Sequence, residues 1–267
     1  RIAYATLGDG LALVRVPRYA QGIELMWRDE EAGAFYGKLG QGRRLIMVER
    51  RGVGHSQREV DDVSMAAHIA DVRAVTDHLG LDRFAMFGDG DAVAVCIAYA
   101  AAHPEQVSRL ILWGGYARSG PVRSEEAGLS LADVARLSPL LATLALANLF
   151  FPSGPVEVQR RTVAFWLQCI SLEVILKYIE FVQDINVVGL LPKIACPALV
   201  LQRRGDQTGH TLEMSREIAA LIPEARLVIV EGDIGVPEYD HEHVIQAITE
   251  FLGEGEEAAA PSREAGG

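Results

Sequence analysis

The sequence predicts one α/β domain built on a mostly parallel sheet, with a helical segment inserted between two of its strands. Over most of the chain, short apolar runs alternate with longer stretches of helical periodicity, which is typical of parallel strands joined by crossover helices. This alternation stops between Ala117 and Pro192, where the pattern is almost wholly helical. The length of 267 residues fits a single domain of this class followed by a short tail.

The expected core alternates strands and helices along residues 1–116 and 193–253. Short apolar runs predict strands at Leu11–Val16, Arg44–Glu49, Phe84–Phe87, Ser108–Trp113, Ala198–Gln202 and Arg226–Val230, with Ile2–Leu7 as an edge strand. Helical periodicity predicts crossover helices at Glu30–Leu39, Met65–Leu79, Ala92–His103, Thr211–Leu221 and His241–Leu252. The two parts of the core are expected to share one sheet.

Residues 117–192 are expected to form a helical cap. Their patterns predict helices at Leu129–Arg136, Pro139–Phe150, Val156–Ile170 and Leu172–Gln183. Ser138 before Pro139 suits a helix start, since serine caps free amides and the first helical position accommodates proline. An insertion of this kind covers the carboxyl ends of the strands, where open α/β sheets bind ligands. The alternative is a helical layer with no cavity beneath it.

The composition argues against several kinds of partner and site. The net charge of −11 argues against nucleic-acid binding, which needs a clustered basic surface. We expect no membrane association, because no apolar run approaches roughly 18 residues. Cys96, Cys169 and Cys196 are an odd number of cysteines in apolar stretches, which indicates reduced, buried thiols in a cytoplasmic protein. Since C-x-x-C, H-E-x-x-H and P-loop patterns are missing, we expect neither a metal nor a cofactor.

The stretch from Arg44 to Trp113 carries a recognisable series of motifs. The turn ERRGVGHS follows one strand, FGDGDA stands at a strand-to-helix turn, and AAAHPEQVSRLILW closes the unit. This series resembles the α/β-hydrolase family, and the resemblance extends over residues 1–253. It implies an α/β-hydrolase-like, doubly wound sheet with an inserted helical cap.

The resemblance also locates three positions that carry the catalytic triad in this family. Counted back from Pro104, the nucleophile position falls on Gly90; the acid position falls on Asp206 and the histidine position on Gly235. A triad needs a nucleophile and a base, and glycine supplies neither. We therefore expect no catalytic residues and a non-catalytic domain that senses a ligand or regulates a larger signalling protein.

The sequence resembles one subset of the α/β-hydrolase family more than the rest. The opening IAYATLGDG and the ending DIGVPEYDHEHVIQAITEFL resemble hydrolase-like domains fused to bacterial class III adenylate/guanylate cyclases or helix-turn-helix regulators. This resemblance implies an output domain after Gly267. Residues 254–267, rich in glycine, alanine and glutamate, then serve as a flexible linker. A homodimer is also compatible with this interpretation.

Two other functions remain open. The first is an enzyme of the ester, lactone or haloalkane class with a non-standard site such as Asp89, Asp91 and Asp206. The competing interpretation of Asp89 and Asp91 is that they cap the helix beginning at Ala92. The second is a structural dimerisation module with no ligand.

The hypothesis of a sensor predicts a small apolar ligand beneath the cap. We expect Gly90 at the floor of an apolar cavity, with polar anchors at Tyr19, Trp27 and Asp206 and with Phe165 and Trp166 as further ligand-binding residues.

His210 is expected to be exposed at the entry to a helix rather than to act as a base. Gly90→Ser alone should then create no esterase, because the new serine lacks a neighbouring base. Gly90→Ser combined with Gly235→His is the pair that could recruit Asp206.

Overall fold

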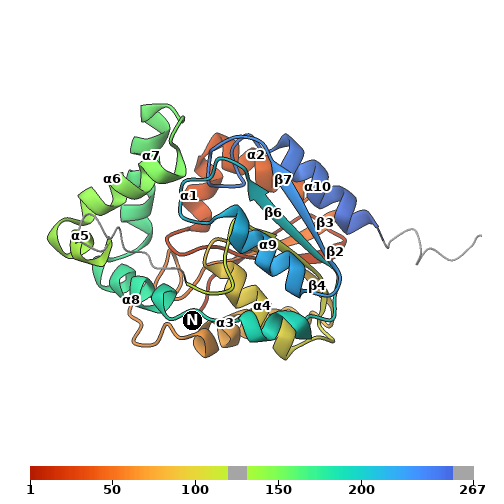
Figure 1. Ribbon diagram of the computed structural model, residues 1–267. Helices are drawn as coiled ribbons and strands as arrows, with labels where there is room; N and C mark the ends of the chain where they lie inside the picture. The colour runs from red at the N-terminus through yellow and green to blue at the C-terminus, as the bar shows by residue number, and fades with distance from the viewer. Residues whose placement is uncertain (120–130, 255–267) are drawn as a thin grey trace, which may run out of the picture.

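The computed structural model describes residues 1–119 and 131–254, and its centre is a seven-stranded sheet (Figure 1). The strands are β1 Tyr4–Leu7, β2 Leu11–Val16, β3 Arg43–Val48, β4 Phe84–Asp89, β5 Val107–Trp113, β6 Ala198–Arg203 and β7 Ala225–Val230. Their order in the sheet is β1-β3-β2-β4-β5-β6-β7, with β1 antiparallel to β3 and the remaining pairs parallel. The expected fold class and the edge position of β1 are confirmed.

Helices cover both faces of this sheet. The core helices are α1 Ile23–Arg28, α2 Glu30–Leu39, α3 Met65–His78, α4 Ala92–Ala102, α9 Leu212–Leu221 and α10 Glu242–Gly253, together with the 3-10 helix η1 Val188–Lys193. Buried side chains of α3, α4 and α9 form a cluster on one face, and those of α2 and α10 form a second cluster on the other. The hydrophobic core is therefore split into two layers by the sheet.

The central strand and the helix that follows it are the most deeply buried part of the molecule. All six residues of β4 are buried. In α4, every residue from Ala92 to Ala100 is buried, because this helix lies between the sheet, α3 and η1. Its small and β-branched side chains allow the close packing that such a position requires. The turn between β4 and α4 is thus held rigidly.

The cap consists of α5 Leu131–Leu137, α6 Pro139–Phe150, α7 Val156–Cys169 and α8 Leu172–Gln183, gathered at one end of the sheet (Figure 1). The α6 helix begins as expected, since the Ser138 hydroxyl accepts a hydrogen bond from the Leu141 amide at 3.3 Å. The cap is joined to the core where the Gly235 amide donates to the Phe150 carbonyl at 2.8 Å.

Some features lie outside the sequence-based expectations. The helices α1 and η1 were not expected, because six-residue segments are too short to show a clear period, and η1 contains Pro192. Residues 255–267 are outside the described part of the chain, so the linker stays a prediction. Among the described helices, none combines the length and apolar character that crossing a bilayer requires.

The three cysteines are free and buried, as expected. Burial raises the pKa of each thiol, to about 11 for both Cys169 and Cys196 and higher still for Cys96. Thiols held in the neutral form are poor nucleophiles. The cysteines therefore belong to the core.

Candidate active site

Gly90 forms the strand-to-helix turn between β4 and α4. Its φ of +59° lies in the left-handed region, which glycine adopts at little cost. A Cβ built on Gly90 would lie 3.2 Å from the Cβ of Arg18 and 3.7 Å from the Cε1 of His210. The side of the turn on which a side chain would project therefore faces the imidazole of His210.

A cavity of about 470 Å³ lies between the cap and the carboxyl edge of the sheet, and Gly90 forms part of its wall. This volume falls within the range of about 300–1,000 Å³ that is usual for small-molecule sites. Apolar side chains of the cap helices dominate the wall: Ala142, Leu146, Leu149, Phe150, Trp166, Leu167, Leu172, Ile175 and Ile179. The expected cavity that reaches Gly90 is confirmed, while its ligand stays a prediction.

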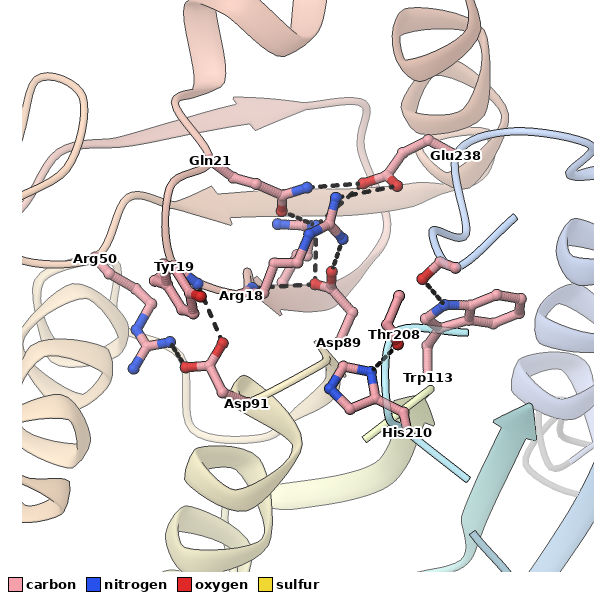
Figure 2. A network of polar contacts seen from close by, with 12 residues as sticks. Arg18, Tyr19, Gln21, Arg50, Asp89, Asp91, Trp113, Thr208, His210 and Glu238 are labelled. Carbon is pink, nitrogen blue, oxygen red and sulfur yellow. Dashed lines mark hydrogen bonds and ion pairs between the residues drawn. The ribbon is translucent and has the colours of Figure 1, made fainter. Parts of the chain in front are cut away.

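A chain of polar contacts reaches the cavity through the loop between β6 and α9. The Thr208 hydroxyl donates to Asp206 Oδ1 at 2.6 Å. Its oxygen also lies 2.9 Å from Nδ1 of His210, as Figure 2 shows. His210 itself lines the cavity beside Gly90 and Tyr116. Burial lowers the pKa of His210, against the opposing effect of the Asp206 charge, so the ring is neutral near pH 7.

This arrangement differs from the expected exposed histidine. His210 is half-buried, because the loop folds under the cap and its ring lies 5.5 Å from that of Tyr116. The expectation that no base lies beside Gly90 is therefore wrong. The signal available in the sequence was the spacing, since His210 follows Asp206 by four residues, with Gly209 between them. In the structure Gly209 has a φ of +92° and turns the chain there.

Gly235 lies beside Asp206 and Thr208. A Cβ built on Gly235 would lie 3.2 Å from Asp206 Oδ1 but only 2.5 Å from the Thr208 Cγ2 methyl group. A real Cβ contact at 2.5 Å does not occur without displacement of a neighbour. Thr208 therefore occupies the space beside Asp206 that a side chain at position 235 would need.

Asp89, the last residue of β4, belongs to a buried cluster of charges. It accepts from Arg15 at 2.9 Å and from Arg18 (Figure 2), and the same Arg15 lies 3.3 Å from Glu238. Gln21 completes the cluster, since its amide oxygen accepts from Arg15 at 2.6 Å and its amide nitrogen donates to Glu238 at 3.3 Å. The carboxylate of Asp89 is thus neutralised by two guanidinium groups.

Asp91 is held in a comparable way. It pairs with Arg50, which is 3% exposed, and it accepts from the Tyr19 amide at 3.2 Å (Figure 2). Asp91 stands at the N-cap position of α4 but makes no side-chain capping bond. The expected position of Asp91 at the helix start is therefore correct, but neither carboxylate makes a capping bond, because arginines from neighbouring strand ends pair with both. Bound in ion pairs, neither aspartate is well suited to attack a substrate.

The expected ligand-binding residues are distributed over two cavities. Tyr19 and Trp166 line the large cavity together with Gly90. Phe165 instead lines a smaller cavity of about 190 Å³ between α7 and the start of α2, and Trp166 forms part of that wall as well. Neighbouring positions on a helix point to different sides, which accounts for the separation of Phe165 from the large cavity.

Two expected anchors do not reach the large cavity. Trp27 is 38% exposed and packs against Tyr36 with ring centroids 6.4 Å apart, because α1 carries it to the outside of α2. Asp206 lies behind Thr208, so its carboxylate acts on the cavity only through the threonine and His210. The structure thus brings Tyr19, Gly90 and Trp166 together and leaves Trp27 apart.

The sequence was also compared with known proteins. A family model described as alpha/beta hydrolase fold matches residues 25–233. The chain belongs to this family. A 2-hydroxymuconate semialdehyde hydrolase of Pseudomonas putida is 34% identical over 120 residues, which are 42% of this chain and 41% of that protein. The chain spans less than half the length of the first curated relatives it matches.

Solved structures give the same fold. An enol-lactonase from Burkholderia xenovorans superposes with a TM-score of 0.80 at 22% identity, covering 94% of this chain and 96% of that one. A thermophilic esterase from Thermogutta terrifontis has a TM-score of 0.81 at 24% identity, with 95% and 93% covered. These similar proteins are named as hydrolases. They contradict the expectation of a non-catalytic sensor or regulatory domain, which rested on the two glycines, on the resemblance to fused signalling domains and on an exposed His210.

Proposed function

We propose that this chain is an enzyme of the α/β-hydrolase fold that hydrolyses small, uncharged, mainly apolar esters or lactones. The observation that carries the proposal is the position of a histidine, His210, in the wall of an apolar cavity and beside Gly90, where burial lowers the pKa of its ring. The names of the similar proteins, among them a semialdehyde hydrolase, an enol-lactonase and an esterase, support hydrolysis as the reaction class.

The proposed mechanism uses water as the nucleophile. We take Gly90 to stand at the family's nucleophile position, where the missing side chain leaves room for a water molecule. His210 accepts a proton from this water as its oxygen forms a bond to the carbonyl carbon of the substrate. The ester C–O bond then breaks, and the imidazolium returns the proton to the departing oxygen. Hydrolysis is direct, without an acyl-enzyme.

The charges around the cavity favour an uncharged substrate. Arg18 is paired with Asp89, and Asp91 is paired with Arg50, so the polar end of the cavity carries no excess charge from these pairs. The remaining wall is mainly apolar, and burying a charged group there would cost several kcal/mol. A neutral acyl chain or lactone ring with its carbonyl group towards His210 fits both features.

The test is hydrolysis of p-nitrophenyl esters of graded acyl length and of γ- and δ-lactones by the purified protein. His210→Gln should lower kcat by at least about 100-fold, since a general base contributes roughly 10²–10⁴-fold. His243→Gln is the matched control, because His243 is exposed on α10. Turnover that survives His210→Gln, or no turnover of any member of the panel, would overturn the proposal.

A further inference from the structure

We infer that Thr208 is a positioning residue that transmits the orienting effect of Asp206 to His210, in the space that Gly235 leaves vacant. The kinetic part of this inference rests on the proposed function, in which His210 is the base. The structural part stands on the contacts of the loop between β6 and α9 alone.

The direction of the hydrogen bonds follows from the chemistry of the three groups. An ionised carboxylate only accepts hydrogen bonds, so the single hydroxyl proton of Thr208 must point to Asp206 Oδ1, at 2.6 Å. The threonine oxygen then faces Nδ1 of His210 at 2.9 Å with its lone pairs. Nδ1 must therefore carry the ring proton and donate it. A neutral imidazole with a proton on Nδ1 has its basic lone pair on Nε2.

Several contacts fix Thr208 in this orientation. Its backbone amide donates to Asp206 Oδ1 at 2.7 Å, so the same oxygen holds the amide and the hydroxyl. Gln202 holds the rest of the loop, because its amide nitrogen contacts Asp206 Oδ2 at 3.3 Å and the His210 carbonyl at 2.9 Å. The Ser215 hydroxyl donates to the Gln202 side-chain oxygen at 2.8 Å, which sets the orientation of that amide group.

The glycine at position 235 is part of the same arrangement. A side chain there would bring its Cβ to 2.5 Å from the Thr208 methyl group, so the threonine side chain or the residue at position 235 would have to shift. Gly235 thus leaves free the space that Thr208 occupies in its present position.

Two near-isosteric variants separate the role of the hydroxyl from that of the packing. Thr208→Val keeps the branched shape and loses the hydroxyl; Thr208→Ser keeps the hydroxyl and loses the methyl group. We expect Thr208→Val to lower kcat by about 100-fold with little change in KM, the lower end of what a general base contributes, and Thr208→Ser to stay near the wild type. Equal kcat for wild type and Thr208→Val would overturn the inference, and so would equal losses in both variants.

Nitrogen NMR of the histidine side chains tests the structural part without any substrate. His210 is assigned among the seven histidines by the loss of its signals in His210→Gln. The wild type should show the proton on Nδ1 near pH 7, and Thr208→Val should shift His210 towards the form with the proton on Nε2. A wild-type ring protonated on Nε2, or a tautomer unchanged by Thr208→Val, would overturn the inference even if the protein hydrolyses esters. The expected tautomers without turnover would support it and reject the proposed function.

Discussion

Two sets of polar side chains flank Gly90, and they use the same residue type in opposite ways. On one side, Asp89 and Asp91 are buried and paired with arginines. On the other side, Asp206 accepts from the neutral donors Thr208 and Gln202. A carboxylate that is paired with a guanidinium group serves the structure and does not act on a further group. A carboxylate that meets a hydroxyl group can orient a base and leave it uncharged.

The arginine side is the costlier of the two to assemble. Removing charges from water costs several kcal/mol for each ion, and their mutual attraction offsets this cost only with good geometry. Aromatic rings contribute here, since the guanidinium carbon of Arg15 lies 5.1 Å from the ring centre of Tyr36 and that of Arg50 lies 4.8 Å from that of Tyr178. The stability of this side should therefore depend on every member being present.

The largest expected effect is on the arginine side. Asp89→Asn would leave Arg15 and Arg18 buried without their main counter-charge and should lower the free energy of unfolding by about 3–5 kcal/mol. Asp206→Asn keeps a hydrogen-bonding side chain and should cost only about 0.5–1.5 kcal/mol. Urea denaturation of both variants measures the difference. Equal losses in the free energy of unfolding for Asp89→Asn and Asp206→Asn would contradict the prediction that the two carboxylates differ in their contribution to stability.

A second prediction concerns a serine introduced at position 90, between the two sets of polar side chains. In Gly90→Ser the Cβ would lie 3.7 Å from His210 Cε1, so a hydroxyl group turned towards the ring should be acylated by p-nitrophenyl acetate and release p-nitrophenol. This replaces the expectation that a serine at position 90 alone would be inert. Gly90→Ala is the control, since both variants bear the same cost of about 1–2 kcal/mol for a side chain at positive φ. Intact-protein mass spectrometry detects the acetyl group, and a folded Gly90→Ser protein that gains none would contradict the prediction.

A third prediction concerns pH. Burial lowers the pKa of His210 and of His68, and the charges of Arg50 and Arg51 lower that of His68 further. Below a pH of about 6.5, the unfolded chain binds protons at these histidines that the folded chain does not. Stability should therefore fall as the pH drops from about 6.5 towards the lowered pKa values, by up to roughly 1.4 kcal/mol per pH unit for each histidine.

The measurement is the free energy of unfolding between pH values of about 7 and 5.5. His68→Phe should reduce the slope, because it removes one of the two groups while keeping an aromatic ring on Tyr178. The acidic limb of kcat should likewise lie below the ordinary histidine value. A free energy of unfolding that stays constant over this range would show that neither ring is held neutral.

The smallest expected effect comes from an ion pair outside both sets. Arg204 lies 2.8 Å from Glu231, with side chains 57% and 77% exposed. Solvent screens such pairs, so Arg204→Ala should change the free energy of unfolding by no more than about 0.5 kcal/mol. If Arg204→Ala lowered the free energy of unfolding as much as Asp89→Asn in the same urea series, burial would not determine how much an ion pair contributes to stability.

The architecture was predictable because its signals are local. The strand Leu11–Val16 and the helices Glu30–Leu39, Pro139–Phe150 and Leu172–Gln183 have the expected bounds, since apolar periodicity and start signals such as Ser138 act within a few residues. The short helices α1 and η1 carry no such period and were missed.

The site was predictable only in part. The position of Gly90 beneath a cap follows from the order of the elements along the chain. The buried charge cluster around Asp89 does not, because Arg15 and Arg18, which pair with Asp89, and Glu238, which pairs with Arg15, come from distant points of the sequence and meet only in the folded chain. The burial of His210 likewise depends on the cap that closes over its loop.

The loop between β6 and α9 contains Asp206, Thr208 and His210 together. Groups on separate loops must be aligned by the whole sheet, and any drift between strands disturbs them. Here the three groups lie on one short segment, so their alignment depends mainly on the local backbone and on the contacts of Gln202. A protein engineer could transplant this segment behind another parallel strand, provided that a glutamine is the next-to-last residue of the strand and a glycine faces the threonine.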